Sequence, residues 1–254
     1  MSRLEDSAWH LSGMRSTAIS DGNRLFDDIS RIIVSGLEKI SRLVPAPALL
    51  RKILALKAHE IARSGDEYDL LIQLIEAENV ASLPGDLIEI GAYMGVGTAR
   101  LARFAKRYNK KLYSIDVFDV SRDTTETSSG MPLSDIYSDF LEKMHINQLE
   151  AYQFMTRGLQ NIVTIPRDSV KVEFPAGQRF IFGFIDGNHS PEYVVNDFYL
   201  VWKHLTSMGM VAFDDYSGDI PQVTRTVDSL IGRHRAEIVK LIRVPPRVIS
   251  LIKK

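Results

Sequence analysis

The chain has 254 residues, with 31 basic and 32 acidic side chains and a formal net charge of −1 at pH 7. This balance gives no electrostatic reason to expect a nucleic acid or an anionic membrane as a partner. The apolar share of 45% and the charged share of 25% are typical of a soluble globular protein. The sequence contains no cysteine, which excludes disulfides, thiolate metal ligands and thiol nucleophiles.

The N-terminus lacks the basic region and apolar core of a secretory signal. No apolar run approaches the roughly 20 residues that a membrane helix needs. We therefore expect a cytoplasmic protein. The length suits one large α/β domain with an appendage.

The N-terminal third is predicted to be helical. Apolar residues recur at helical spacing from Leu25 to about Val80, and Pro45 and Pro47 divide this region into at least two helices. The last of these helices begins near Asp66 and Glu67, which resemble an acidic first turn. We predict an N-terminal helical extension or cap over residues 1–83 and a second domain over residues 84–254.

From residue 87 onward, short apolar runs alternate with helix-like segments. Strands are predicted at 87–90, 112–115, 162–165, 180–185 and 210–213, and helices at 96–107, 134–146, 149–157, 191–206 and about 220–233. Two β-rich runs around Pro245 and Pro246 predict a terminal hairpin. The polar segment 121–133 predicts a mobile loop. Apolar strands that alternate with helices predict a doubly wound, mostly parallel sheet covered on both faces.

Residues 87–97 read L-I-E-I-G-A-Y-M-G-V-G, a strand that ends in a glycine-spaced turn. Asp116 follows the next strand, about 20 residues beyond the turn, which is where an acid binds the ribose of a nucleoside. The alternative is a tight strand-to-helix connection without a ligand. The spacing departs from G-x-G-x-x-G, and Glu89 is a poor neighbour for a pyrophosphate. An acid here suits an ammonium or sulfonium group, which favours S-adenosylmethionine over NAD.

Acids recur where the predicted strands end. Beyond Asp116 they are Asp168, Asp186, Asp214 and Asp215. Carboxyl ends of parallel strands meet at one edge of a sheet, where these charges would repel one another without a cation among them. A divalent metal is the simplest cation for the last three, and oxygen ligands favour a hard ion such as Mg²⁺. The alternative for Asp214 and Asp215 is a solvated turn with a helix cap.

His189 lies three residues after Asp186, in the run Asp-Gly-Asn-His. A histidine so close to the end of a strand is a candidate general base, although a lone histidine is by default a surface residue. Tyr93, inside the glycine turn, and Tyr216, after the acid pair, are candidates for ligand contact.

Three stretches together resemble the class I S-adenosylmethionine-dependent methyltransferases, over roughly residues 84–232. They are P-G-D-L-I-E-I-G-A-Y-M-G-V-G-T, F-I-D-G-N-H-S-P-E-Y-V-V-N-D and G-M-V-A-F-D-D-Y. The closest subgroup is the metal-dependent small-molecule O-methyltransferases, which include macrocin-type sugar methyltransferases. The resemblance implies a seven-stranded sheet whose last strand is antiparallel. Asn188 departs from the aspartate that is common in relatives at that position.

The resemblance also implies roles for particular residues. The methionine part of the cofactor would be lined by Glu89, Gly91, Ala92 and Tyr93, the ribose would be bound by Asp116, the adenine would lie beside Asp168, and the metal would be held by Asp186, Asp214 and Asp215. Asp186 and His189 are the catalytic candidates, because one of them could accept the proton of a metal-bound hydroxyl.

We therefore predict an S-adenosylmethionine-dependent O-methyltransferase that acts on a hydroxyl of a small molecule with Mg²⁺ or another hard divalent cation. The alternatives are a non-catalytic S-adenosylmethionine-binding module, an NAD(P)-dependent reductase on a similar fold, and a metal-dependent hydrolase. The N-terminal helices are expected to cap the active site, to pair two subunits of a homo-oligomer, or both. The acceptor itself stays open to a sugar, polyol or phenol-like hydroxyl.

Overall fold

The computed structural model describes residues 67–144, 146–244 and 247–254. These residues belong to one compact unit, Gly65–Lys254. Most of the predicted helical extension over residues 1–83 lies outside the described residues, so this domain assignment stays a prediction. Within the described ranges, no helix is long and apolar enough to cross a membrane.

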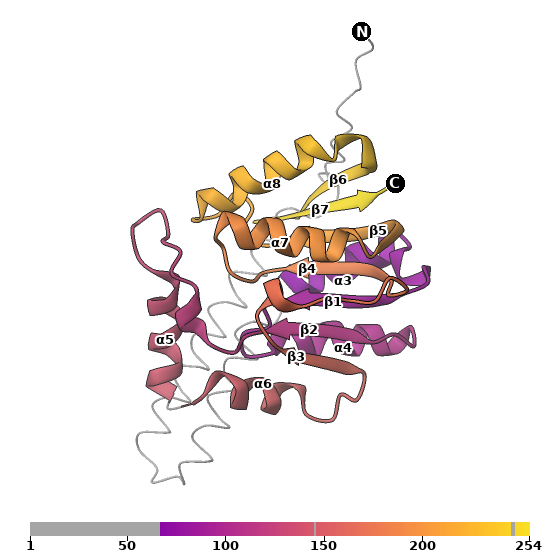
Figure 1. Cartoon of the computed structure of the whole chain (residues 1–254). Coiled ribbons are helices and arrows are strands. Elements are labelled where there is room, and N and C mark those ends of the chain that lie inside the picture. The colour runs from indigo at the N-terminus through magenta and orange to yellow at the C-terminus, as the bar shows by residue number, and fades with distance from the viewer. Residues whose placement is uncertain (1–66, 145, 245–246) are drawn as a thin grey trace, which may run out of the picture. The chain divides into compact units, whose positions relative to one another are not determined.

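A seven-stranded sheet with the order β3-β2-β1-β4-β5-β7-β6 forms the centre of the unit (Figure 1). The strands are β1 (Asp86–Ile90), β2 (Leu112–Asp116), β3 (Ile162–Pro166), β4 (Phe180–Ile185), β5 (Leu205–Phe213), β6 (Ile238–Val244) and β7 (Val248–Lys253). The first five are parallel to one another, whereas β7 is antiparallel to both of its neighbours. The mostly parallel sheet with an antiparallel last strand is confirmed.

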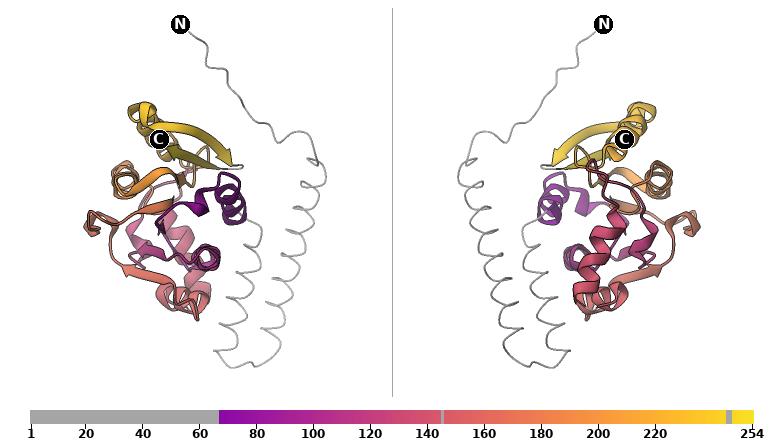
Figure 2. Two further views of the ribbon diagram at one scale, coloured as in Figure 1. Left: turned by 90° about the vertical axis from the view of Figure 1, so that its right-hand side faces the viewer. Right: turned by 90° about the vertical axis from the view of Figure 1, so that its left-hand side faces the viewer.

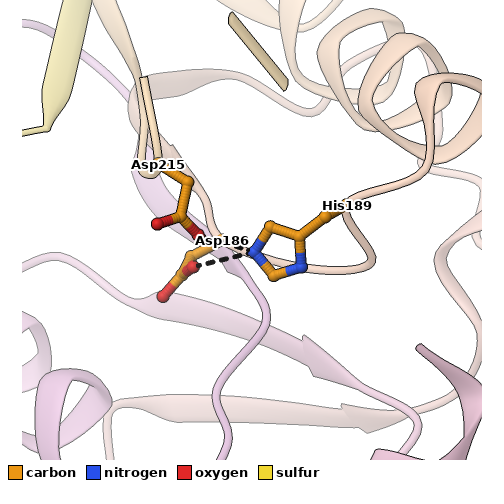
Figure 3. Close-up of side chains that lie close together, drawn as sticks. All are labelled: Asp186, His189 and Asp215. Carbon is orange, nitrogen blue, oxygen red and sulfur yellow. Dashed lines mark ion pairs between the residues drawn. The ribbon is translucent and has the colours of Figure 1, made fainter. Parts of the chain in front are cut away.

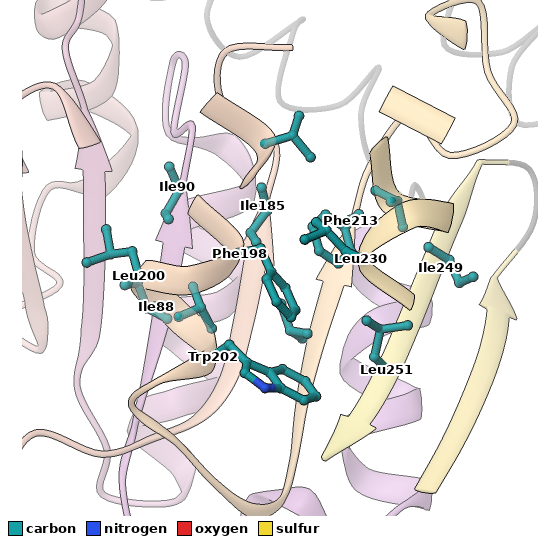
Figure 4. Packing of buried hydrophobic residues seen from close by; sticks show 14 of the residues in the cluster. Ile88, Ile90, Ile185, Phe198, Leu200, Trp202, Phe213, Leu230, Ile249 and Leu251 are labelled. Carbon is teal, nitrogen blue, oxygen red and sulfur yellow. The ribbon is translucent and has the colours of Figure 1, made fainter. Parts of the chain in front are cut away.

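Helices cover both faces of the sheet (Figures 1 and 2). They are α3 (Glu67–Ala77), α4 (Val96–Arg107), α5 (Leu133–Met144), α6 (Gln148–Thr156), α7 (Pro191–Trp202) and α8 (Pro221–Arg233), with four short 3₁₀ turns named η1 (Val80–Ser82), η2 (Val120–Arg122), η3 (Ser169–Lys171) and η4 (Arg235–Glu237). Alternate residues of β1 point to opposite faces: Leu87 packs with α3 and α4, while Ile88 packs with α7 and α8. Figure 4 shows the hydrophobic core on the face of the sheet to which Ile88 points, where Phe198 and Trp202 of α7 lie against the strands.

The predicted elements agree closely with the structure, with one exception between α7 and β5. The helix predicted to reach residue 206 ends at Trp202, and the strand predicted at 210–213 begins at Leu205. Leu205 pairs with Phe180, and the register then shifts before Phe182 pairs with Met210. The irregular pairing hides the start of the strand, because a bulge interrupts the apolar pattern on which the prediction depends.

The segment 121–133, predicted as a polar mobile loop, is partly ordered by local structure. It overlaps η2 and contains an isolated bridge between Glu126 and Pro132. Two residues of the segment are nevertheless buried, Asp123 at 9% exposure and Leu133 at 6%. The terminal hairpin is confirmed as β6 and β7.

Candidate functional site

The glycine turn between β1 and α4 lies against the chain that leaves β4. Gly91 has φ of +91°, and a Cβ atom placed on it would lie 1.8 Å from the carbonyl oxygen of Asp186. The amide of Asp186 donates to the carbonyl of Ile90 at 2.8 Å, which extends the ladder of the sheet to this edge. Only glycine permits both the positive φ and the approach of the two backbones. The turn and the acidic edge are therefore directly adjacent.

Asp116, at the end of β2, holds the glycine turn through its carboxylate. One oxygen accepts from the amides of Ala92 and Tyr93, both at 2.8 Å. The other accepts from the amide of Phe118 at 2.6 Å and from the side chain of Gln148 at 3.3 Å. A carboxylate has about four acceptor positions, so Asp116 is saturated by the protein itself. A ribose hydroxyl would have to replace one of these donors.

Glu89 lies beneath the glycine turn and is fully buried. Its carboxylate accepts hydrogen bonds from the hydroxyl groups of Tyr68, Thr98 and Ser114. Burial outweighs these bonds and raises the pKa of Glu89 to about 7. These three hydroxyl groups come from α3, α4 and β2, so Glu89 links these elements beside the glycine turn.

Asp186, His189 and Asp215 converge at the carboxyl edge of the sheet (Figure 3). They follow β4, precede α7 and follow β5, respectively. Each offers one ligand atom, and the three atoms lie within 4.8 Å of one another. Nε2 of His189 is 2.8 Å from Oδ2 of Asp215 and 3.8 Å from Oδ1 of Asp186. Two loops, β4–α7 and β5–α8, thus supply one group of two carboxylates and one imidazole.

Asp123 holds His189 from the opposite side of the ring. Its Oδ2 lies 2.6 Å from Nδ1 of His189 and also accepts from the backbone amide of that histidine at 3.2 Å. Sequence reasoning missed Asp123, because it lies 66 residues away in a polar segment without periodicity. The side chain of Asn188 donates to the carbonyl of Arg122 at 3.1 Å, which joins the same two segments a second time.

The group is strongly coupled by charge. Burial on its own lowers the pKa of His189, but its contacts with Asp123 and Asp215 outweigh burial and raise the pKa to about 10. Burial and the charges of Asp214 and Asp215 raise the pKa of Asp186 well above its usual value. Burial also opposes ionisation of Asp215, yet His189 and Arg247 hold the pKa of Asp215 below its usual value.

Arg247, between β6 and β7, is the second cation at this edge. Its Nε lies 3.2 Å from Oδ1 of Asp214, and its Nη1 lies 3.2 Å from Oδ1 of Asp215. Asp214, predicted as a metal ligand, therefore faces Arg247 and is not part of the three-residue group. The charge argument from sequence was incomplete, because His189 and Arg247 already offset part of the acidic charge.

Two other predicted residues make contacts with protein groups. Asp168 precedes η3, accepts from the amide of Val170 at 3.3 Å, and accepts from the hydroxyl of Tyr193 at 3.1 Å. Tyr216 is only 5% exposed, and its hydroxyl donates to Asp228 at 2.8 Å. Tyr216 is therefore packed in the interior, whereas Tyr93 stays within the turn.

The three-residue group fits a divalent metal. Ligand atoms about 2.1 Å from one ion and at right angles to one another lie roughly 3 Å apart. Nε2 of His189 and Oδ2 of Asp215 have about this separation, at 2.8 Å, whereas Nε2 and Oδ1 of Asp186 are farther apart, at 3.8 Å. Nε2 of His189 is buried, and its contact at 2.8 Å with Oδ2 of Asp215 is an ion pair whose hydrogen-bond geometry is poor. A buried nitrogen aimed at two carboxylates is the arrangement that a metal ion would complete.

Comparisons with known proteins concern the family and the fold. The model of a methyltransferase-domain family matches residues 88–216, which is half of the chain. The O-methyltransferase NovP has a similar structure, with a TM-score of 0.58, 16% identity, and coverage of 91% of this chain and 99% of NovP. CalS11, a TDP-rhamnose 3'-O-methyltransferase of calicheamicin biosynthesis, also has a similar structure. Its TM-score is 0.54 and its identity is 18%, with coverage of 87% of this chain and 93% of CalS11. No curated protein sequence matches.

Proposed function

Because the chain belongs to the methyltransferase-domain family, which implies S-adenosylmethionine as methyl donor, we propose that it methylates a hydroxyl group of a small molecule with the help of a divalent metal. The similar structures support the choice of oxygen as acceptor, since NovP and CalS11 are both O-methyltransferases. The sugar substrate named for CalS11 makes a sugar or polyol hydroxyl the first acceptor class to test, with phenol-like hydroxyls next.

The proposed cofactor site runs along the glycine turn. Gly91, Ala92 and Tyr93 would lie along the methionine part, with Glu89 supporting the turn from below through its buried carboxylate. Asp116 would accept from the ribose after exchange of its longest bond, the 3.3 Å contact from Gln148, because the longest bond costs least to lose. This places the methyl donor beside the chain that leaves β4.

The adenine would lie beside Asp168 in this proposal. The hydroxyl of Tyr193 donates to Oδ2 of Asp168 at 3.1 Å, so the carboxylate has a fixed direction before the cofactor binds. A carboxylate that is already oriented loses less entropy when a ligand binds.

The acidic edge would prepare the acceptor. A divalent metal held there supplies a Lewis acid that lowers the pKa of the acceptor hydroxyl. Asp186 and Asp215 provide the carboxylates that hold it, and His189 contributes a buried imidazole at the same point. Methyl transfer is an in-line displacement that discharges the sulfonium, so the remaining task of the protein is to align donor and acceptor.

The contact between Gly91 and Asp186 is the observation that carries this proposal. It joins the turn proposed for the methyl donor to the residues proposed to activate the acceptor, with no intervening layer of side chains. Two reacting groups held at neighbouring positions gain a large effective concentration, which is the main requirement of a displacement reaction.

Incubation with carbon-13 methyl-labelled S-adenosylmethionine, Mg²⁺ or Mn²⁺ and a metabolite extract tests the proposal. We expect a new methyl signal in the chemical-shift range of O–CH₃ groups, and no signal with the Asp215→Asn variant. The variant should bind S-adenosylhomocysteine as the wild type does in calorimetry. Binding of the cofactor without product from any acceptor class would support the non-catalytic module instead.

A further inference from the structure

We propose that His189 is a metal ligand through Nε2 and that Asp123 is the residue that positions it, so that the site is a mixed nitrogen and oxygen site. Such a site binds Mn²⁺, Co²⁺ or Zn²⁺ through its imidazole, whereas Mg²⁺ gains little from that nitrogen. The inference rests on the proposed function, but it replaces the all-oxygen ligand set expected from the sequence.

The ring of His189 has a fixed orientation. Asp123 binds Nδ1 at 2.6 Å and the backbone amide of the same residue at 3.2 Å, so both the ring and its main chain are held by one carboxylate. Metal-binding histidines almost always donate their other ring nitrogen to such a partner, which sets the tautomer and the direction of the free nitrogen. The arrangement from Asp123 through His189 to the acidic edge has this form.

The surroundings of Nε2 favour a ligand over a general base. The histidine is only 5% exposed, and Nε2 faces Asp215 at 2.8 Å and Asp186 at 3.8 Å (Figure 3). A general base has to reach the proton of an acceptor hydroxyl, directly or through one water. Nε2 instead faces two carboxylates, the groups that would share a metal ion with it.

Asp214 contacts Arg247 at this edge of the sheet. Its Oδ1 lies 3.2 Å from Arg247 Nε, whereas Oδ2 of Asp215 lies beside His189. Arg247 contacts both aspartates, and Asp215 contacts the imidazole as well. In our proposal His189 takes the third ligand position, which the sequence analysis assigned to Asp214.

A spectroscopic measurement tests the ligand assignment without relying on activity. Mn²⁺ is added to the full chain with S-adenosylhomocysteine, and electron spin echo modulation reports nitrogen bound to the ion. We expect an imidazole signal in the wild type, its loss in His189→Gln, and its retention in the control His234→Gln. His234 also pairs with a carboxylate, Glu237 at 2.8 Å, but it lies at the C-terminal end of α8.

Affinities separate a ligand from a residue with a purely structural role. Co²⁺ binds more tightly than Mg²⁺ at almost any such site, so the comparison between variants is the informative one. We expect His189→Gln and Asp123→Asn to weaken Co²⁺ binding by about tenfold to 100-fold. Mg²⁺ binding should change by less than about threefold, because carboxylates and water satisfy that ion. An equal loss for both metals would mean that Asp123 only supports the fold.

The possible failures are distinguishable. Bound Mn²⁺ without a nitrogen signal in the wild type overturns the ligand role of His189 but leaves metal-assisted methyl transfer standing. Absence of any Mn²⁺ binding to the wild type overturns the metal site as a whole and with it this inference. Methyl transfer in the presence of a chelator would then show that the reaction does not depend on a metal ion.

Discussion

Two structural constraints require glycine at position 91. Its φ of +91° costs an L-residue roughly 1–3 kcal/mol, and its Cβ would overlap the Asp186 carbonyl at 1.8 Å. We expect Gly91→Ala to destabilise the protein by more than this strain alone and to move the glycine turn away from the acidic edge. Urea unfolding and S-adenosylhomocysteine calorimetry measure the two effects.

Gly232 provides the matched control. It lies within α8, and a Cβ placed there has nothing within 4 Å. The same Gly→Ala change should stabilise the protein by about 0.5–1 kcal/mol, because alanine favours a helix over glycine. If Gly91→Ala were as well tolerated as Gly232→Ala, the close approach of the two backbones would be wrong.

Glu89 makes stability depend on pH. Its pKa rises from 4.5 to about 7 on folding, so the folded state binds the proton more tightly than the unfolded state. The stability from this group is therefore fully present below pH 4.5 and is lost as the pH rises through 7. The difference between these two pKa values corresponds to about 3 kcal/mol.

Glu89→Gln, which cannot ionise, isolates this contribution. We expect the stability of the variant relative to the wild type to increase between pH 5 and pH 8, by up to about 3 kcal/mol, in cofactor-free unfolding experiments. A difference between the two proteins that stays constant across this range would show that Glu89 does not carry the shifted proton.

At the scale of single residues, the sequence identified acids that follow strands but not their partners. Asp186 and Asp215 could be placed together, because neighbouring parallel strands end at one edge. The sequence gives no comparable signal for Asp123 or Arg247, since each comes from an irregular segment whose path depends on tertiary packing. The different contacts of Asp214 and Asp215 could not be predicted either, because adjacent side chains of one type differ only in their three-dimensional neighbours.

Among the elements, α5 places a tyrosine beside the glycine turn, which the sequence did not predict. This residue is Tyr137, whose ring lies 5.1 Å from that of Tyr93 in the glycine turn. Burial and the nearby charges of Asp186 and Asp215 raise the pKa of Tyr137. The phenol of Tyr137 is therefore a neutral group close to both the glycine turn and the acidic edge.

We expect Tyr137→Phe to raise the KM for the acceptor by roughly twofold to tenfold, the value of one hydrogen bond, and to leave cofactor affinity unchanged. Steady-state kinetics with the identified acceptor measure both quantities. Tyr108→Phe is the control, because that hydroxyl binds Glu76 between α4 and α3. Equal effects of the two substitutions would remove Tyr137 from the acceptor site.

For the molecule as a whole, the hydrophobic pattern predicted the strands and helices of the sheet, whereas the antiparallel direction of the last strand was implied by the family resemblance. Fully apolar strands alternating with helices predicted the covered parallel sheet, and the two runs beside Pro245 and Pro246 predicted the final hairpin. The boundary between α7 and β5 was misplaced, because the bulge near Phe180 breaks the pattern. The extension over residues 1–83 lies largely outside the described residues, so its role as cap or subunit contact stays a prediction.

Dependence of methyl transfer on a divalent ion tests the central claim most directly. The full chain is stripped with a chelator and assayed for labelled O-methyl product before and after addition of Mn²⁺ or Mg²⁺, alongside Asp215→Asn. We predict that the stripped wild type is inactive, that added metal restores it, and that the variant stays inactive while binding S-adenosylhomocysteine. Product formation by the stripped wild type at the full rate, or by the variant, would contradict the account.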